Sequence, residues 1–541
     1  AEGAIWLASV GEGDARQFTS GSGRDDNPRW SPDGKSLAFL SERAEPGRRD
    51  LYRIPRGGGE AEPLIHRKRG IERFAWSPDG GRLAFLCPDD PDDEDERREK
   101  ERDDAEVYGE RWPLNRLRLF DLSTRETRTL STEDLHLTEL VWSPDGRRIA
   151  YAARPTPELE SGVRSRVAVI PVDGEGKSIQ LAVDGGYTPH DLCWGADSDS
   201  LLFVGGHDPQ PQGSFTVYMV PADGSGKARV VGPSRDDECC VIGLRSVPGS
   251  KRFAMLVAEG LTTRVEWLDP ESGERDVLYG YPDGDVVNAD AVMCDGSPVL
   301  TVVRSSGSQP PEIYVGTPDN LRQASDHHAP LREFEFGTQE PFYWNAPDGL
   351  QIDGVLIRPP RAADGPSPMV TLVHGGPYGR SSNGWNLRPL GWAQYLAAHG
   401  YAVLMPNYRG GAGRGHRFAI NARGNVGEGD FPDVLSGVDA AIERGIADPD
   451  RLGIGGWSQG GFMTAWAVGH TNRFKAGVMG AGVSDWNMMT LTSDLPTFEA
   501  VLGGSRPWDG IDRDRAAEVS PIYFAATAVT PLLMLHGKND E

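Results

Sequence analysis

Short apolar stretches alternate with turn-forming residues along about the first 330 positions of the chain. The pentapeptide Trp-Ser-Pro-Asp-Gly occurs at 30–34, 76–80 and 142–146, and an apolar run begins three residues after each copy. More divergent copies lie at 194–197 and 246–249. Proline fixes φ and glycine supplies the positive φ of a tight turn, while alternating apolar and polar residues are typical of strands. The pattern predicts a series of β-hairpins.

A second apolar element recurs between these turns. Several short strands in each unit of about 50 residues are typical of a β-propeller, and seven copies predict seven blades, the first of them incomplete. A β-sandwich is the alternative, but it has no reason to keep such a period. The one long interval contains a charged insertion at 88–111, which we expect to form a solvated loop or an exposed helix. The alternative is that its end, at 108–116, reaches into a substrate chamber. The copies begin at Ile5, Leu51, Leu117, Val167, Val217, Val265 and Ile313.

The pattern changes near residue 335. Beyond it, short apolar runs alternate with amphipathic stretches such as those at 391–398 and 434–444. Strands that alternate with helices predict a doubly wound, mostly parallel sheet, whose ligands bind at the carboxyl ends of the strands. We therefore predict a β-propeller domain over 1–334 and an α/β domain over 335–541. The strands of the sheet are expected at 369–373, 402–405, 452–454, 476–479 and 532–535.

The sequence Gly456-Trp457-Ser458-Gln459-Gly460 is the central candidate for chemistry. Alone it is weak evidence, because a chain this rich in glycine gives about half a match to G-x-S-x-G by chance. Its context is stronger, since an apolar strand precedes it and a helical stretch follows it. Such a turn exposes the serine Oγ at a helix N-terminus, where developing negative charge is favoured. We predict that Ser458 is a nucleophile; a glycine-rich turn that only packs a helix is the alternative.

Attack on a carbonyl group creates an oxyanion that needs two hydrogen-bond donors. In the chain order of an α/β-hydrolase, one donor is the backbone N–H after the nucleophile, here that of Gln459. The second comes from a loop after an earlier strand, and the sequence His-Gly-Gly-Pro at 374–377 follows the apolar run 371–373. Glycines let this backbone approach a substrate closely. A plain turn is the alternative interpretation.

The acid and the histidine of a hydrolase triad follow the serine, in that order. Asp540 stands just after the predicted strand 532–535, where the acid belongs, whereas the competing Asp485 and Asp494 do not follow a strand in this way. None of the eleven histidines lies beyond Asp540, and a serine without a base is a poor nucleophile at neutral pH. We therefore expect the chain to continue for roughly 80–110 residues that include the histidine. A decayed, non-catalytic protein is the alternative.

Composition and charge exclude several classes of function. The chain has 541 residues and a net charge of −24, which would repel nucleic acid or an anionic membrane surface. No stretch of about 18 apolar residues is present, so no membrane span is expected. The five cysteines form no C-x-x-C pair and no metal or nucleotide motif is recognisable, which predicts no disulfide, no metal site and no cofactor. We expect a cytoplasmic protein, and a removed leader before Ala1 is left open.

Several of these sequences together resemble the prolyl oligopeptidase family of serine peptidases. They are the Trp-Ser-Pro-Asp-Gly repeats, the 374–377 loop, Asn-Tyr-Arg-Gly at 407–410, the serine turn and His-Gly-Lys-Asn-Asp at 536–540. The resemblance covers essentially the whole chain and implies a propeller followed by an α/β-hydrolase domain, with Ser458 as nucleophile and Asp540 as triad acid. In that family the propeller restricts access, which implies short peptides as substrates. A homo-oligomer is left open.

The branch of the family is indicated by the oxyanion loop. Some members use a tyrosine hydroxyl as donor where this chain has His374, so that donor is absent. The loop is more similar to that of acylaminoacyl peptidases and related aminopeptidases, which implies the Gly376 N–H as second donor. Val483, Trp486 and Met489 match positions that line the pocket for the residue before the scissile bond, although plain core residues are the alternative. The resemblance thus implies an exopeptidase, with a prolyl oligopeptidase or dipeptidyl peptidase as the alternative.

Overall fold

The chain divides into two compact units. The first comprises Ala1–Gly205, Val217–Val231 and Leu244–Ser246, and the second comprises Gly206–Thr216, Gly232–Gly243 and Val247–Glu541. The computed structural model describes residues 3–11, 13, 15–105, 107, 109–131, 133–173, 177–183, 188–361, 365–387, 391–510 and 513–540.

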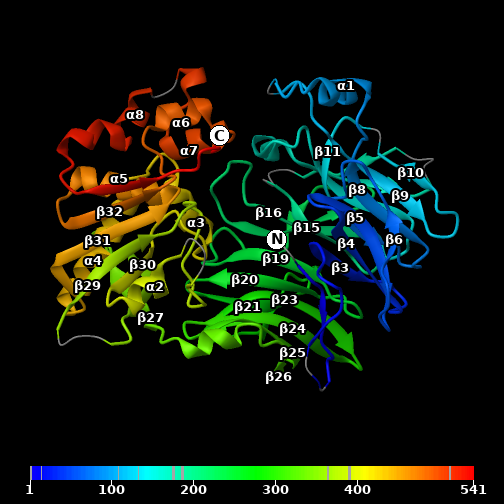
Figure 1. Cartoon of the computed structure of the whole chain (residues 1–541), viewed down its shortest axis with the longest axis horizontal. Coiled ribbons are helices and arrows are strands. Elements are labelled where there is room, and N and C mark those ends of the chain that lie inside the picture. The colour runs from blue at the N-terminus through cyan, green and yellow to red at the C-terminus, as the bar shows by residue number, and fades with distance from the viewer. Residues whose placement is uncertain are drawn as a thin grey trace. The chain divides into compact units, whose positions relative to one another are not determined.

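Six sheets of four strands follow one another along the chain, and consecutive strands pair within each sheet, as in the blades of a β-propeller (Figure 1). The first three sheets contain β3 (Asp25–Trp30), β4 (Ser36–Glu45), β5 (Arg48–Pro55), β6 (Glu62–Ile65); β7 (Arg73–Trp76), β8 (Arg82–Pro88), β9 (Asn115–Asp121), β10 (Thr127–Thr129); β11 (His136–Trp142), β12 (Arg148–Arg154), β13 (Arg166–Pro171) and β14 (Ile179–Gln180). The next three contain β15 (His190–Trp194), β16 (Ser200–Gly206), β17 (Phe215–Pro221), β18 (Arg229–Val230); β19 (Cys240–Ser246), β20 (Phe253–Glu259), β21 (Thr262–Leu268), β22 (Arg275–Tyr279); β23 (Gly284–Cys294), β24 (Ser297–Ser306), β25 (Gln309–Thr317) and β26 (Asn320–Gln323).

The described residues form six four-stranded blades where the sequence predicts seven. The first copy of the repeated apolar element, at Ile5, leads only into β1 (Trp6–Leu7), which pairs with β2 (Arg16–Gln17). Two strands of two residues each cannot make a blade of four. The prediction of seven blades therefore needs correction, while the propeller architecture is confirmed.

The repeated pentapeptide forms the same turn in each copy. Ser31 Oγ donates to Asp33 Oδ1 at 2.6 Å, and Ser143 Oγ donates to Asp145 Oδ1 at 2.6 Å. The same Asp145 oxygen accepts the N–H of Arg147 at 3.0 Å. The glycine of the turn has positive φ, for example 66° at Gly34. The serine and aspartate side chains therefore close the turn, and glycine supplies the backbone conformation that other residues disfavour.

The tryptophans of the repeat join successive sheets of the first unit. Trp142 Nε1 donates to the carbonyl oxygen of Ala75 at 3.2 Å, and Trp194 Nε1 donates to that of Val141 at 3.1 Å. Trp76 Nε1 makes the corresponding bond, at 3.2 Å, to a backbone oxygen of β3. Each of these indoles therefore belongs to one blade and satisfies a carbonyl group of the preceding blade.

The charged insertion contains the helix α1 (Asp93–Glu101), which has no buried residue. Asp92 caps its N-terminus through a reciprocal pair of bonds with Asp95, and its first turn is acidic while its last turn is basic. Both features stabilise an isolated helix. The expectation of a solvated loop or exposed helix is confirmed for the described residues of the insertion.

A seven-stranded sheet forms the core of the last part of the chain (Figure 1). Its order is β27-β28-β30-β29-β31-β32-β33; the two pairings at the β27 end are antiparallel and the other four are parallel. Helices cover both faces, because α2 belongs to one buried apolar cluster with β28 and β30, while α4 and α5 belong to another. The strands are β27 (Thr338–Asn345), β28 (Gln351–Arg358), β29 (Ser367–Val373), β30 (Ala402–Asn407), β31 (Ala447–Trp457), β32 (Phe474–Gly480) and β33 (Leu532–Leu535).

The five strands expected in this part are all present, and the shortest of the predicted runs, 452–454, is extended at both ends to form β31. None of the helices in the described residues is long and apolar enough to cross a membrane. The helices are α2 (Ala393–Ala398), α3 (Gly415–Ala419), α4 (Asp430–Glu443), α5 (Gln459–His470), α6 (Trp486–Thr492), α7 (Pro496–Gly503) and α8 (Arg513–Glu518), with 3-10 turns η1 (Leu159–Arg164), η2 (Ala329–Glu333), η3 (Ile420–Ala422), η4 (Pro507–Asp509) and η5 (Pro521–Thr527).

Candidate active site

The 374–377 loop, Ser458 and Asp540 lie at one edge of the seven-stranded sheet. They follow β29, β31 and β33, which run parallel in the order β29-β31-β32-β33, and Val373 pairs with Gly456 at the ends of the first two. The carboxyl ends of parallel strands meet at the same edge, where ligands of such sheets bind. The fold therefore places the three candidates at the edge that suits chemistry, with one strand, β32, between the serine and the aspartate.

Ser458 occupies a strained turn between β31 and α5. Its φ is 57° and its ψ is −120°, a combination that a residue with a side chain rarely adopts. The turn is fixed on both sides: the Ser458 N–H donates to Gly480 O at 2.9 Å, and the Phe462 N–H donates to Ser458 O at 2.9 Å. The serine side chain itself is exposed. Such strain persists only where surrounding bonds enforce it, and it is most often found at functional sites.

Glycines around Ser458 leave the space that the turn requires. A Cβ atom added to Gly456 or to Gly460 would lie less than 3.0 Å from the carbonyl oxygen of Val373. A Cβ atom on Gly461 would lie equally close to the carbonyl oxygen of Gly480. These neighbours are backbone atoms of β29 and β32, so they cannot move aside as a flexible side chain would. The glycines of the motif are therefore needed for the turn itself.

The 374–377 loop lies directly beside the serine. A Cβ atom built on Gly375 would be 3.3 Å from Ser458 Cβ and 3.9 Å from Ser458 Oγ. Gly376 has a φ of 130°, a conformation that favours glycine. The structure therefore brings the predicted oxyanion loop against the predicted nucleophile, and Gly375 is the point of closest approach.

Two backbone N–H groups at this place are free to bind an oxyanion. Gln459 is the first residue of α5, so its N–H has no acceptor within the helix, and it lies at the positive end of the helix dipole. Among the described residues, none accepts a hydrogen bond from the N–H of Gly376. Both groups are therefore available as donors within the described residues, and their role as an oxyanion hole stays a prediction.

His374 is a neutral, half-buried part of the loop. Burial lowers the pKa of its imidazole to about 4, so the ring is uncharged at neutral pH. Nδ1 lies 2.9 Å from Gly375 O, and the ring stacks on Tyr408 at a centroid distance of 4.4 Å. The Tyr408 hydroxyl donates to His374 O at 2.8 Å. Tyr408 therefore holds the start of the loop twice, a role that the sequence did not indicate.

A cavity of about 200 Å³ adjoins the serine turn. Its wall includes His374 and Gly375 from the loop, Trp457 from the end of β31, and the Arg380 and Asn386 side chains. A group bound there would lie beside Trp457, the residue before Ser458, and beside the end of β29. The cavity therefore adjoins the residue that precedes the candidate nucleophile.

The three candidate aspartates have different environments. Asp485 accepts the N–H groups of Asn487 at 2.9 Å and of Met488 at 3.3 Å, so its carboxylate caps α6. Asp494 is exposed and accepts a bond from the adjacent serine. Asp540 follows β33, and its Oδ2 lies 3.3 Å from His536 Nε2. Asp540 is thus the candidate whose carboxylate faces an imidazole at the strand edge.

A general base for Ser458 is not found among the described residues. No described group makes a hydrogen bond to Ser458 Oγ, and three histidines of this part of the chain are engaged elsewhere. His374 stacks on Tyr408, and His470 stacks on Trp466 at 3.8 Å. The position of the base therefore stays a prediction.

The predicted substrate pocket has only part of its wall exposed. Val483 and Met489 are half-buried, and Val483 packs against the hydrophobic core. Trp486 is fully buried, and its ring meets Phe462 edge-on at 5.4 Å. Val483 and Met489 therefore have surface to offer a substrate, whereas Trp486 belongs to the core. The pocket itself stays a prediction.

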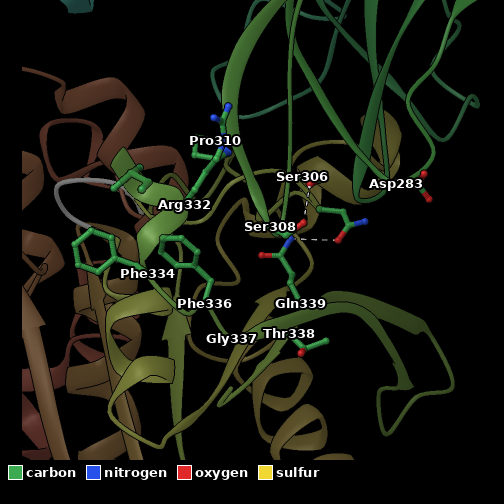
Figure 2. A pocket seen from close by; sticks show the side chains of 13 residues that line it. Asp283, Ser306, Ser308, Pro310, Arg332, Phe334, Phe336, Gly337, Thr338 and Gln339 are labelled. Atoms are coloured by element: carbon green, nitrogen blue, oxygen red, sulfur yellow. Dashed lines mark hydrogen bonds between the residues drawn. The ribbon is translucent and has the colours of Figure 1, made fainter. Parts of the chain in front are cut away.

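Two further observations concern the described residues outside this site. No group of three or more His, Cys, Asp or Glu side chains within the described residues is arranged to hold a metal ion. A larger cavity, of about 560 Å³, lies at the turn between β24 and β25 and the segment before β27 (Figure 2). Figure 2 shows Arg332, Phe334 and Phe336 around it. None of the predicted site residues lines this cavity.

Comparison with known proteins agrees with the resemblance. The sequence model of the prolyl oligopeptidase family matches residues 390–541. The uncharacterized peptidase YuxL of Bacillus subtilis (strain 168) is 28% identical, over 99% of this chain and 84% of its own length. The acylamino-acid-releasing enzyme of Sus scrofa is 26% identical, over 78% of this chain. The match spans only 53% of that enzyme, about half of its length.

The same architecture is found among solved structures. The acylaminoacyl peptidase of Pyrococcus horikoshii matches with a TM-score of 0.76 and 20% identity, over 97% of this chain and 80% of that chain. At this level of identity the likeness establishes the fold. The chain therefore has the two-part fold of that structure, a propeller followed by a hydrolase-type domain.

Proposed function

We propose that this chain, whose C-terminal part belongs to the prolyl oligopeptidase family, is a serine peptidase that cleaves short peptides near one end. The observation that carries the proposal is an exposed serine in a strained turn, with the glycine loop against its side chain and free N–H groups on both. Among the relatives is an acylamino-acid-releasing enzyme, which supports the acylaminoacyl-peptidase or aminopeptidase type. No cofactor takes part in the proposed reaction.

The proposed reaction is acyl transfer to water. Ser458 Oγ attacks the carbonyl carbon of the scissile bond while a base removes its proton. The oxygen that becomes negative lies between the N–H groups of Gln459 and Gly376. The C–N bond then breaks, and the protonated base gives its proton to the leaving amine. Water attacks the acyl-enzyme with help from the same base, and the acid leaves.

We propose that the base is a histidine, oriented by Asp540. Two observations support this: Asp540 stands at the correct strand end, and no described histidine bonds Ser458 Oγ. The complete open reading frame tests it directly. A reading frame that continues and encodes a histidine supports the triad. A natural stop codon directly after Glu541 overturns it and favours a non-catalytic protein.

The nucleophile is tested by Ser458→Ala, measured on acyl-aminoacyl and aminoacyl anilides. We expect the loss of at least about 10⁴-fold in kcat, because the residual rate then comes from binding and the oxyanion donors alone. Labelling by a fluorophosphonate probe should disappear as well. Ser484→Ala is the matched control, since Ser484 is exposed and follows the neighbouring strand β32. Undiminished turnover in Ser458→Ala would discard the assignment.

The type of peptidase is tested by pairs of substrates that differ in one end. An N-acetylated alanyl anilide, the free alanyl anilide and a glycyl-prolyl anilide separate the three types. Faster hydrolysis of either alanyl substrate supports an exopeptidase with an apolar pocket around Val483 and Met489. Preference for the prolyl substrate favours the alternative, a prolyl oligopeptidase or dipeptidyl peptidase.

A further inference from the structure

We propose that the segment Gly206–Thr216, which connects β16 to β17, positions the oxyanion loop, with Gln212 and Phe215 as the positioning residues. The inference rests on the proposed function, because it assigns a role to residues that touch the loop and not the substrate. The segment lies within the second compact unit, together with the loop that it contacts. Nothing in the sequence motifs pointed to it, since more than 150 residues separate it from the loop.

An ion pair anchors the segment to the turn after η3. Arg423 Nη2 donates to Asp208 Oδ1 at 2.9 Å and Arg423 Nη1 to Oδ2 at 3.2 Å, a bidentate arrangement. Arg423 Nε also donates to Gln212 O at 2.9 Å. His416 Nε2 lies 3.3 Å from Asp208 Oδ2. Although burial raises the pKa of Asp208, the bonds from His416 and Arg423 lower it overall, so the carboxylate is charged at neutral pH.

The fit between the segment and its anchor is close. A Cβ atom on Gly213 would lie 2.9 Å from His416 Cε1 and 3.2 Å from Arg423 Nη2. A side chain at this position would therefore require His416 or Arg423 to shift. Gln212 is buried beside it, with 5% of its surface exposed. The segment is thus held by its backbone as well as by the Asp208 side chain.

Gln212 reaches the oxyanion loop through the strand end of β30. Its Nε2 donates to Gly410 O at 3.2 Å. The segment 408–412 in turn contacts the start of the loop and the residue two positions after its end: the Tyr408 hydroxyl donates to His374 O at 2.8 Å, and the Ala412 N–H donates to Gly379 O at 2.9 Å. A shift of the Gln212 contact is therefore transmitted to the chain on both sides of the loop.

Phe215 contacts the residue that directly follows the loop. Its ring lies 5.9 Å from that of Tyr378, with the planes tilted by 56°. Tyr378 stands two residues after Gly376, the proposed oxyanion donor. Aromatic pairs in this range of distance and tilt stabilise one mutual arrangement. The phenylalanine therefore restrains the loop on the side that Gln212 does not reach.

The need for such support follows from the chemistry of the loop. An oxyanion donor must lie about 3 Å from the place where the charge develops, which is a demand on position. A loop with two successive glycines has little conformational preference of its own. Packing by neighbouring residues must then supply the precision. Because the donor acts on the transition state more than on the bound substrate, its displacement lowers kcat more than it raises KM.

The experiment uses Gln212→Ala and Phe215→Ala in the full-length protein. We expect each to lower kcat by about 10-fold, a part of the 10²–10³-fold that follows removal of an oxyanion donor, with KM changed less than about twofold. A peptide boronic acid, which forms a tetrahedral adduct, should bind more weakly by the same factor as kcat falls. Binding of the carboxylate product should stay unchanged, which a merely structural defect would not achieve.

Matched controls come from the same segment. Gln210→Ala removes an exposed glutamine two residues away and should leave kcat within about twofold, because Gln210 contacts Arg423 and not the loop. Phe215→Tyr keeps the ring and should retain most of the rate. If Phe215→Ala fails to fold, Phe215→Leu removes the ring contact while it keeps the apolar volume.

A second measurement separates this inference from the proposed function. Hydrogen exchange at the amides of 374–379 should become faster in Gln212→Ala than in the wild type, whether or not the protein hydrolyses peptides. Unchanged exchange and unchanged kcat in both variants would overturn the inference. Equal losses of kcat and of product affinity would show that the segment has only a structural role, which would also overturn the inference. If the wild type shows no hydrolysis that depends on Ser458, the proposed function fails by itself.

Discussion

At the scale of single residues, the serine turn shows how glycine and strain act together. Ser458 holds a φ of 57° because its backbone is bonded to Gly480 and Phe462. The adjacent glycines allow β29 and β32 to come close enough for those bonds. The strain of the serine is thus compensated by the neighbouring strands. The cost of this arrangement is that no side chain is tolerated at the glycine positions.

Gly460→Ala tests this at one position. The added Cβ would lie less than 3.0 Å from the carbonyl oxygen of Val373. We expect a loss of about 1–3 kcal/mol in the free energy of unfolding, measured by urea denaturation, together with a strong fall in kcat. Gly453→Ala is the matched control, because its nearest contact would be an ordinary 3.5 Å. Equal stability of the two variants would contradict the crowding argument.

At the scale of secondary structure, α4 begins with two buried aspartates of different character. Asp433 forms a paired salt bridge with Arg409, with Nη2–Oδ1 at 2.7 Å and Nε–Oδ2 at 2.9 Å. Asp430 accepts the Gly427 N–H at 2.7 Å through one oxygen, while its second oxygen is buried without a partner. Burial, with the charge of Asp433 adding to it, raises the pKa of Asp430 to about 7.

The pH dependence of stability tests the state of Asp430. Since its pKa is higher in the folded than in the unfolded chain, folding favours the protonated form. Its contribution is complete below about pH 4 and is lost as the pH rises through 7. The loss amounts to about 4 kcal/mol at most. Asp430→Asn keeps the acceptor without the charge, so it should gain stability relative to the wild type between pH 5 and pH 8.

Urea unfolding at several pH values measures this difference. Glu443→Gln, at the exposed end of the same helix, serves as the control and should show no such trend. A difference between Asp430→Asn and the wild type that does not change with pH would show that Asp430 is charged in the folded protein.

Elements that carry their own local pattern were predictable from the sequence, and those defined by packing were not. The turns at Ser31 and Ser143 were recognisable because serine, aspartate and glycine close them locally. The strand that leads to Ser458 was recognisable from its apolar run. The number of complete blades was not, because one copy of an element does not show that three partners exist. The link from Gln212 to Gly410 was not either, since it joins residues 198 positions apart.

At the scale of the whole molecule, packing and secondary structure divide the chain differently. By secondary structure, the seven-stranded sheet begins with β27 at Thr338, and the domain boundary at 334/335 stays a prediction. The second compact unit also includes β20–β26. Arg380 illustrates the reason: it donates to Gly260 O at 2.7 Å and to Thr262 O at 3.0 Å, which joins the sheet domain to the blade strands of its unit.

The net charge of −24 predicts an effect of salt on substrate association. A strongly acidic protein attracts cationic peptides over a distance that salt shortens. We expect kcat/KM for a lysine-containing peptide to fall as ionic strength rises from about 20 to 500 mM, while that of its norleucine analogue stays nearly constant. Initial-rate assays at one pH measure kcat/KM for both peptides. If kcat/KM depends on ionic strength equally for the two peptides, the negative charge of the protein does not act on the approaching substrate.

The tryptophan bonds between blades give the molecule built-in optical probes. Trp76, Trp142 and Trp194 each hold an indole against a carbonyl group of the preceding blade. The emission of an indole shifts when such a hydrogen bond is replaced by one to water. The emission of each of these rings therefore reports on the contact between two neighbouring blades. If the contacts between blades break together on heating, the three emission transitions will coincide. If the blades separate one after another, the transitions will follow the order of the blades.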